Sequence, residues 1–168
     1  MRALIVYFSR ADENYFGGAL RTVSVGNTEI VAGKLAALTG APLFRIDPVT
    51  PYSKSYNACI AEAQEDQRRG ARPELKAYPD SLDGYDTIYL GYPNYWGTMP
   101  MPVFTFLDHF DFTGKTIRPF CTHEGSGMGH SESDLKKLCP GARVEKGLAL
   151  RGSGVNQADA ALRQWIGQ

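Results

Sequence analysis

Hydroxyl and amide groups follow the first apolar run of the chain in a pattern that could bind a phosphate. The run Ala3–Phe8 leads into Ser9 and Arg10, and an amphipathic segment begins further on at Gly26-Asn27-Thr28. A helix start carries unpaired backbone N–H groups and the positive end of the helix dipole, and both attract anions. We therefore expect the Ser9 and Thr28 hydroxyls and the N–H groups of residues 26 to 28 to converge on the phosphate of a small molecule.

Two later loops carry an aromatic set and a small polar set of residues. The loop after residues 86–91 contains Pro93, Asn94, Tyr95, Trp96 and Gly97. The loop after residues 115–121 contains Thr122, His123, Glu124, Gly125, Ser126 and Gly127. A flat conjugated ring can stack on an indole or a phenol, and glycines let backbone amides approach its polar edges. The two loops are therefore expected to hold such a ring beside the phosphate.

Strand-like and helix-like patterns alternate along the chain. Apolar runs predict strands over residues 3–8, 43–46, 86–91, 115–121 and 143–150. Helical periodicity predicts helices over residues 28–39, 54–70, 100–110 and 157–166, and another after an apparent capping box of Ser131 and Asp134. This alternation predicts a single-domain α/β fold over residues 1–168, with a doubly wound, five-stranded parallel sheet. Ligands of such sheets bind beyond the carboxyl ends of the strands, where the three loops would meet.

One residue conflicts with this pattern. Pro119 lies inside the fourth predicted strand, where it has no N–H group to donate to a neighbouring strand. We expect either that strand pairing ends at Pro119 or that this strand lies nearer the edge of the sheet.

Composition excludes several classes of function. Lys plus Arg and Asp plus Glu balance at 18 each, so no basic surface field for nucleic acid is expected. Cys59, Cys121 and Cys139 lack C-x-x-C spacing, which argues against a metal site and favours a reducing compartment. The N-terminal apolar run is short for a signal peptide or a membrane span. We expect a cytoplasmic protein that binds no membrane.

Taken together, the three loops resemble those of the flavodoxin family. The resemblance implies a flavodoxin-like fold with strand order 2-1-3-4-5 and noncovalently bound flavin mononucleotide (FMN). By position, the phosphate loop would comprise Ser9, Arg10, Gly26, Asn27 and Thr28. Trp96 and Gly97 would lie beside the flavin ring, and residues 123–127 would form the second ring loop. Residues 11–25 separate the two halves of the phosphate loop and are expected to form a lid or a partner contact.

The resemblance leaves two functions open. The first is a flavodoxin-type electron carrier that serves redox partner proteins or a small electron acceptor. The alternative is a flavin-dependent NAD(P)H reductase that acts on a quinone or a similar acceptor. In either case Gly97 would let the peptide beside the ring rotate, since glycine has no Cβ, and a protonated His123 would stabilise negative charge on the ring.

Other interpretations of the same residues are weaker. His123 and Glu124 form either an acid–base pair or a solvent-facing loop pair. The glycines at 125, 127 and 129 superficially resemble a dinucleotide motif, but they follow the wrong strand for it. A phosphate-accepting signalling receiver is excluded, because Ser9 and Arg10 stand where its acidic cluster would be required.

Overall fold

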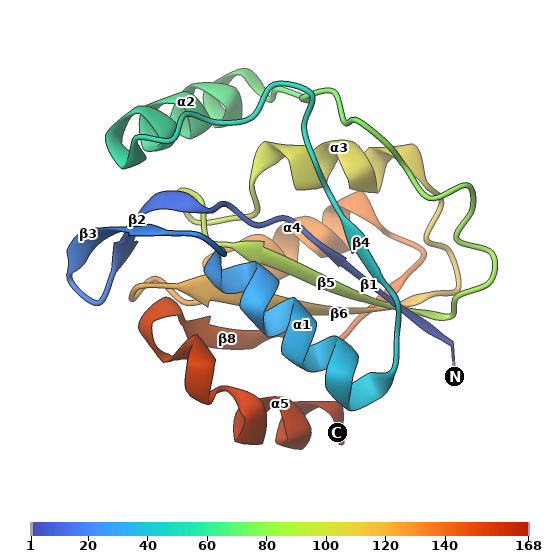
Figure 1. Ribbon diagram of the computed structural model, residues 1–168. Coiled ribbons are helices and arrows are strands. Elements are labelled where there is room, and N and C mark those ends of the chain that lie inside the picture. Colours follow the sequence, from blue (N-terminus) through green and yellow to red (C-terminus); the bar gives the residue numbers. More distant parts are fainter. Residues whose placement is uncertain (1, 168) are drawn as a thin grey trace.

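A parallel sheet runs through the centre of the molecule (Figure 1). The computed structural model describes residues 2–167. The sheet has the order β4-β1-β5-β6-β7, and β8 also pairs with β6. Every pair in it is parallel. With β4 as the second predicted strand and β7 and β8 together as the fifth, this order is the expected 2-1-3-4-5, so the predicted fold class is confirmed.

Most predicted strands and helices are present, with ends moved by a few residues. The strands of the main sheet are β1 (Ala3–Tyr7), β4 (Leu43–Arg45), β5 (Thr87–Pro93), β6 (Thr116–His123), β7 (Arg143–Val144) and β8 (Leu148–Arg151). The helices are α1 (Asn27–Thr39), α2 (Tyr56–Arg69), α3 (Met101–His109), α4 (Ser131–Leu138) and α5 (Asp159–Ile166), with a 3₁₀ segment, η1 (Gly152–Gln157), before α5. The predicted strand 143–150 is thus two short strands.

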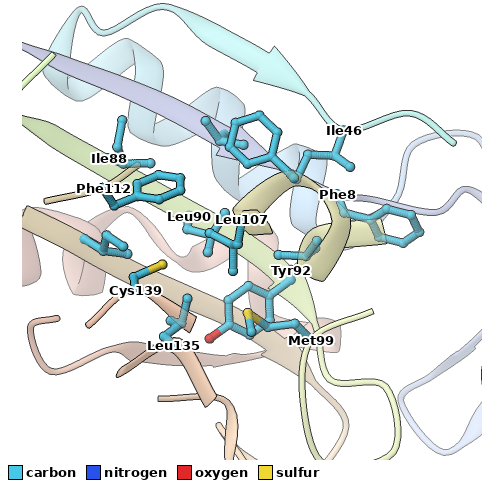
Figure 2. Packing of buried hydrophobic residues seen from close by; sticks show 14 of the residues in the cluster. Phe8, Ile46, Ile88, Leu90, Tyr92, Met99, Leu107, Phe112, Leu135 and Cys139 are labelled. Atoms are coloured by element: carbon cyan, nitrogen blue, oxygen red, sulfur yellow. The ribbon is translucent and has the colours of Figure 1, made fainter. Parts of the chain in front are cut away.

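Each face of the sheet has its own apolar core. Neighbouring residues of β1 point to opposite faces, since side chains alternate along a strand. Val6 therefore belongs to one core and Ile5 to the other. Figure 2 shows the packing of the first core, whose buried members include Phe8, Ile88, Leu90, Tyr92, Met99, Leu107 and Leu135. The second core packs against α1 and α5 and includes Val31, Leu35, Tyr89, Phe120, Leu162 and Trp165.

The structure explains how Pro119 is tolerated inside the sheet. β6 is an inner strand, because it pairs with β5 on one side and with β7 and β8 on the other. The carbonyl of Ile117 accepts the N–H of Glu145 at 3.0 Å, on the β7 side. Two residues further on, the nitrogen of Pro119 faces the same side, at the gap between β7 and β8. Pairing is thus interrupted on one side at Pro119, whereas the expected shift of the strand toward the sheet edge is wrong.

The apparent capping box before α4 is also a wrong prediction. Ser131 is the first residue of α4 rather than its N-cap, and it is fully buried. Its hydroxyl donates to the carbonyl of Met128 at 2.7 Å and accepts a hydrogen bond from the hydroxyl of Tyr92 at 2.8 Å. The Ser131 hydroxyl, which would have capped α4, is therefore used in hydrogen bonds to Tyr92 and Met128 instead.

Residues 11–25, which the sequence left without a structure, contain a β-hairpin. Its strands, β2 (Asp12–Phe16) and β3 (Ala19–Val23), pair only with each other among the described residues. Gly17 and Gly18 form the two-residue turn with φ of 61° and 90°, a left-handed conformation that glycine adopts without strain. The hairpin extends beyond the carboxyl ends of the sheet strands (Figure 1).

Two further features bear on the sequence-based expectations. Cys59, Cys121 and Cys139 are all buried, and none of them forms a disulfide within residues 2–167. No helix in that part of the chain is both long enough and apolar enough to cross a membrane.

The contact between β5 and β6 generates a stability prediction. A Cβ added at Gly91 would overlap the ring of Phe120, its register partner on β6. Gly91→Ala is expected to lower the free energy of unfolding by about 1–3 kcal/mol, because overpacking forces the ring out of place. Urea denaturation would measure this change. The control is Gly33→Ala in α1, where an added Cβ meets nothing within 4 Å and a gain of about 0.5–1 kcal/mol is expected. Equal effects at both sites would contradict the packing argument.

Candidate functional site

A pocket of about 320 Å³ lies at the carboxyl ends of β1, β5 and β6. The three predicted loops meet there. Of the predicted site residues, those that line the pocket are Ser9, Arg10, Asn27, Thr28, Pro93, Asn94, Tyr95, Trp96, Gly97, Thr122, His123, Glu124 and Ser126. Gly26, Gly125 and Gly127 do not line it.

The two halves of the predicted phosphate loop are rejoined in space. The hairpin leaves and returns at adjacent points, so that a Cβ added at Gly26 would collide with Ser9 Oγ and with the carbonyl oxygen of Arg10. Gly26 is the N-cap of α1, but it has no side chain to cap the helix. Ser9 Oγ takes that role and accepts the N–H of Glu29 at 3.1 Å. The end of β1 and the start of α1 therefore form one continuous site despite the insertion.

The start of α1 offers donors that could bind a phosphate. The N–H of Glu29 goes to Ser9, and the N–H of Ile30 goes to the carbonyl of Gly26 at 3.2 Å. The N–H groups of Asn27 and Thr28 have no acceptor among residues 2–167. The first N–H groups of a helix attract anions, both as donors and through the helix dipole. An anion would therefore find two free backbone donors in the pocket wall.

Hydroxyl groups from two loops meet beside these donors. Thr28 Oγ1 lies 2.8 Å from Thr122 Oγ1, and both residues are buried. A hydroxyl can donate one hydrogen bond and accept others, so this pair can rearrange toward a ligand while it keeps α1 and the end of β6 together. Thr28 and Thr122, which were predicted in two different loops, thus lie side by side in the pocket wall.

Arg10 lines the pocket, but its guanidinium group serves the protein. Its Nε and Nη2 groups donate to the carbonyl of Ser53 at 3.2 and 2.8 Å, and Nη2 also donates to the carbonyl of Lys54 at 2.7 Å. Nη1 donates to the carbonyl of Glu13 at 2.5 Å and to Asn14 Oδ1 at 3.0 Å. Arginine has five N–H donors, and these five bonds occupy all of them. Arg10 therefore ties the hairpin to the segment before α2, where sequence reasoning expected a phosphate contact.

The aromatic loop after β5 is a tight turn. The N–H of Tyr95 donates to the carbonyl of Thr98 at 2.8 Å, and the reverse bond measures 3.3 Å. Trp96 and Gly97 have φ of 54° and 89°, so both central residues are left-handed, which is uncommon for a tryptophan. Its indole Nε1 donates to the carbonyl of Ile60 on α2 at 2.8 Å. This bond fixes the orientation of the indole, although Trp96 remains 46 % exposed.

Asn94 and His130 fix the turn through hydrogen bonds to the backbone of Gly97. Asn94 Nδ2 donates to the carbonyl of Gly127 at 2.8 Å, and its Oδ1 accepts the N–H of Gly97 at 2.9 Å. The carbonyl of Gly97 accepts the N–H of His130 at 2.7 Å. Asn94 thereby joins the two ring loops, and any rotation of the peptide at Gly97 has to break one of these bonds.

His123 and Glu124 make separate contacts. His123 Nδ1 accepts the N–H of Gly125 at 2.9 Å, so this nitrogen carries no proton. Burial, and then the positive charge of Arg151, lower the pKa of His123 below its usual value. Glu124 Oε2 accepts the N–H of Gly17 from the hairpin at 3.4 Å. Neither side chain bonds to the other within residues 2–167, so this arrangement gives no support to an acid–base pair.

Several pocket residues were not expected from the sequence. Asn14 and Tyr15 come from the hairpin, and Tyr56, Cys59, Ile60 and Ala63 come from α2. The α2 residues lie at spacings of three, four and seven, which places them on one helical face. For the hairpin, the Gly-Gly dipeptide between an aromatic and an aliphatic run was the available signal. Among the described residues, no group of three or more His, Cys, Asp or Glu side chains is placed to hold a metal ion.

The chain is similar to proteins of one family over most of its length. The family model described as Flavodoxin matches residues 19–168, a range that leaves out β1 and Ser9. No curated protein matches the chain. A candidate flavoprotein of Bacteroides eggerthii is 28 % identical, with a TM-score of 0.79, and the alignment covers 99 % of this chain and 96 % of that one. A candidate flavoprotein of Bacteroides uniformis is also 28 % identical, with a TM-score of 0.76, and the alignment covers 99 % of this chain and 98 % of that one.

A third structure is a flavoprotein of Lactobacillus acidophilus in complex with FMN. It is 22 % identical, with a TM-score of 0.67, over 93 % of this chain and 97 % of that one. It shares the fold of the sheet and helices described above. The family match, which extends from β3 through α5, includes two of the three loops that line the pocket. On this evidence the chain belongs to the flavodoxin family.

Proposed function

We propose that this protein binds FMN noncovalently and transfers electrons through it. The observation that carries this proposal is the convergence of the loops after β1, β5 and β6 on one pocket, with anion donors at one wall and an aromatic turn at another. Membership of the flavodoxin family supports the proposal. So does the FMN complex of the Lactobacillus acidophilus protein, which has the same fold.

The residues of the pocket fit the two ends of FMN. The N–H groups of Asn27 and Thr28 suit a phosphate, and the hydroxyls of Ser9 and Thr122 lie on the same wall. Trp96 suits a conjugated ring, because stacked aromatic groups attract each other beyond the area they bury. FMN, when bound, would supply the capacity to accept and release one or two electrons.

The protein itself would orient the ring and control the charge around it. The bonds of Asn94 to both ring loops keep the turn of Gly97 and the loop of Gly127 at a fixed separation. The lowered pKa of His123 leaves this side chain neutral near pH 7. Arg10 uses its donors within the protein. The pocket therefore offers no free cationic donor from His123 or Arg10 to stabilise a negatively charged ring.

The partners of this redox chemistry belong to the proposal as well. As a carrier, the protein would serve redox partner proteins or a small electron acceptor. Its 18 basic and 18 acidic residues balance, so the net charge of the protein would not steer a charged protein partner over long distances. This balance favours a small acceptor, and with it the second candidate function, an NAD(P)H reductase for quinone-like molecules.

Substitution of Thr28 tests the phosphate site. Thr28→Ala removes a hydroxyl from the start of α1 and leaves Thr122 Oγ1 without its 2.8 Å partner. We expect the dissociation constant of FMN to rise about ten- to a hundredfold, equivalent to about 1.5–3 kcal/mol, with that of riboflavin little changed. Flavin fluorescence titration measures both. Thr39→Ala at the far end of α1 is the matched control. An equal loss of riboflavin and FMN binding would show that Thr28 acts through the fold alone.

The charge of His123 is a second test. NMR titration of the imidazole is expected to give a pKa below the ordinary value of about 6.5, so that the positive charge develops only as the pH falls below neutrality. Arg151→Gln should raise this pKa, because a neighbouring positive charge is removed while burial persists. His109 and His130 provide internal references in the same spectra. A His123 pKa that does not respond to Arg151→Gln would contradict the assigned cause.

Steady-state kinetics separate the two candidate functions. The holoprotein is mixed with NADH or NADPH and a soluble quinone, and oxidation of the nicotinamide is followed without any partner protein. Turnover faster than about 1 s⁻¹, within the usual range of enzymes, would establish the reductase. Turnover at the rate of free FMN would leave the carrier as the function.

A further inference from the structure

We infer that the hairpin and α2 together form a binding wall for a flat, uncharged electron acceptor, with Tyr15 and Tyr56 as its contact residues. The inference rests on the proposed function, because it places a second ligand in the pocket beside FMN. The wall consists of Asn14 and Tyr15 from β2 and of Tyr56, Cys59, Ile60 and Ala63 from α2.

The side chains of the wall that line the pocket are mostly aromatic and aliphatic. The rings of Tyr15 and Tyr56 lie 6.1 Å apart with an interplanar angle of 38°, so they form a tilted aromatic pair. Tyr15 is 43 % exposed although it lines the pocket. Ile60 and Ala63 continue the surface along α2 toward the indole of Trp96, which is bonded to the Ile60 carbonyl. Such a surface suits a planar apolar ligand.

Hydrogen bonds hold the hairpin against α2 independently of any ligand. The N–H of Glu13 donates to the carbonyl of Lys54 at 3.2 Å, and Glu13 Oε1 accepts the N–H of Tyr56 at 2.9 Å. At the other end of the hairpin, the N–H of Gly17 donates to Glu124 Oε2. Since the wall is anchored at both ends, it is formed before a ligand arrives, which lowers the entropic cost of binding.

Arg10 beside the wall and Asn14 within it use their polar groups inside the protein, and among residues 2–167 this leaves only the Tyr15 and Tyr56 hydroxyls without a partner. The five donors of Arg10 all go to acceptors of the chain. Asn14 Nδ2 donates to the carbonyl of Arg10 at 3.0 Å, and Asn14 Oδ1 accepts from Arg10. The phosphates of a dinucleotide require donors, and the wall has no unused guanidinium group to supply them, so we assign the wall to the electron acceptor and not to a nicotinamide donor. A quinone requires only a ring surface and the neighbouring flavin.

The electron balance of this transfer is simple. A quinone bound at the wall would gain two electrons, both drawn from the reduced flavin, and two protons, which the flavin releases as it is oxidised or which solvent supplies, and it would leave as the hydroquinone. No further oxidant or reductant enters this half-reaction, and the flavin returns to its oxidised form.

The experiment uses the FMN-loaded protein and duroquinone, a fully methylated benzoquinone to which the Cys59 thiol cannot readily add. Binding to the oxidised holoprotein is measured by ligand-observed NMR. Reoxidation of the dithionite-reduced holoprotein is measured by anaerobic stopped flow. For the double variant Tyr15→Ala/Tyr56→Ala we expect the quinone dissociation constant and the half-saturating quinone concentration to rise about tenfold. Reoxidation by ferricyanide, which needs no ring surface, should change less than about twofold.

The control variant is Leu20→Ala. Leu20 is the cross-strand partner of Tyr15 and is 45 % exposed, but it does not line the pocket. It tests whether a weakened hairpin, rather than a lost ring, causes the effect, and its quinone affinity is expected to match that of the wild type.

Three outcomes would overturn the inference. The first is unchanged quinone affinity in the double variant with FMN bound normally. The second is an equal loss in Leu20→Ala. The third is an FMN dissociation constant raised about tenfold in the double variant, which would assign the wall to the flavin itself. Failure of the wild-type protein to bind FMN in the fluorescence titration is a different result, because it would remove the proposed function before the quinone is added.

Discussion

The close approach of Gly26 to the Ser9–Arg10 backbone is the contact on which the functional site depends. A side chain at position 26 would occupy the space of Ser9 Oγ and of the Arg10 carbonyl. Because glycine leaves that space free, the chain can leave β1, form a whole hairpin and return to the same point. Ser9 then reaches the N–H of Glu29, and the start of α1, whose first N–H groups can attract an anion, lies in the wall of the pocket.

The inserted hairpin, residues 11–25, changes the role of Arg10, the residue directly before it. Arg10 follows the hydroxyl that caps α1, yet its guanidinium group is surrounded by carbonyl oxygens from the hairpin and from Ser53 and Lys54. Backbone acceptors at both sides satisfy the planar donor group better than one distant anion would. The positive charge thus anchors a wall over the pocket, while the proposed anion site would rely on backbone N–H groups. Trp96 connects the same wall to the ring loops through the Ile60 carbonyl.

Much of the fold was predictable because it follows local rules. Buried parallel strands are continuous apolar runs, as in β5, and the glycine after Thr39 ends α1 in the left-handed conformation that such caps require. The wrong predictions concern residues whose contacts depend on groups far away in the sequence. Ser131 bonds to Tyr92 rather than capping α4. Pro119 is tolerated inside the sheet because the last strand breaks opposite it, which no pattern around Pro119 itself could indicate.

The sequence by itself determined the order of the main strands and helices, the family resemblance and the three loops that meet at the pocket. These features depend on periodicity and on turn residues, which are local properties of the chain. Only the tertiary structure decided that residues 11–25 form a wall, that Arg10 is used to hold it, and that α2 lines the pocket. Those outcomes depend on which groups meet across more than forty positions, as Arg10 and Ser53 do, and hydrogen-bond partners at that separation are set by the packed fold.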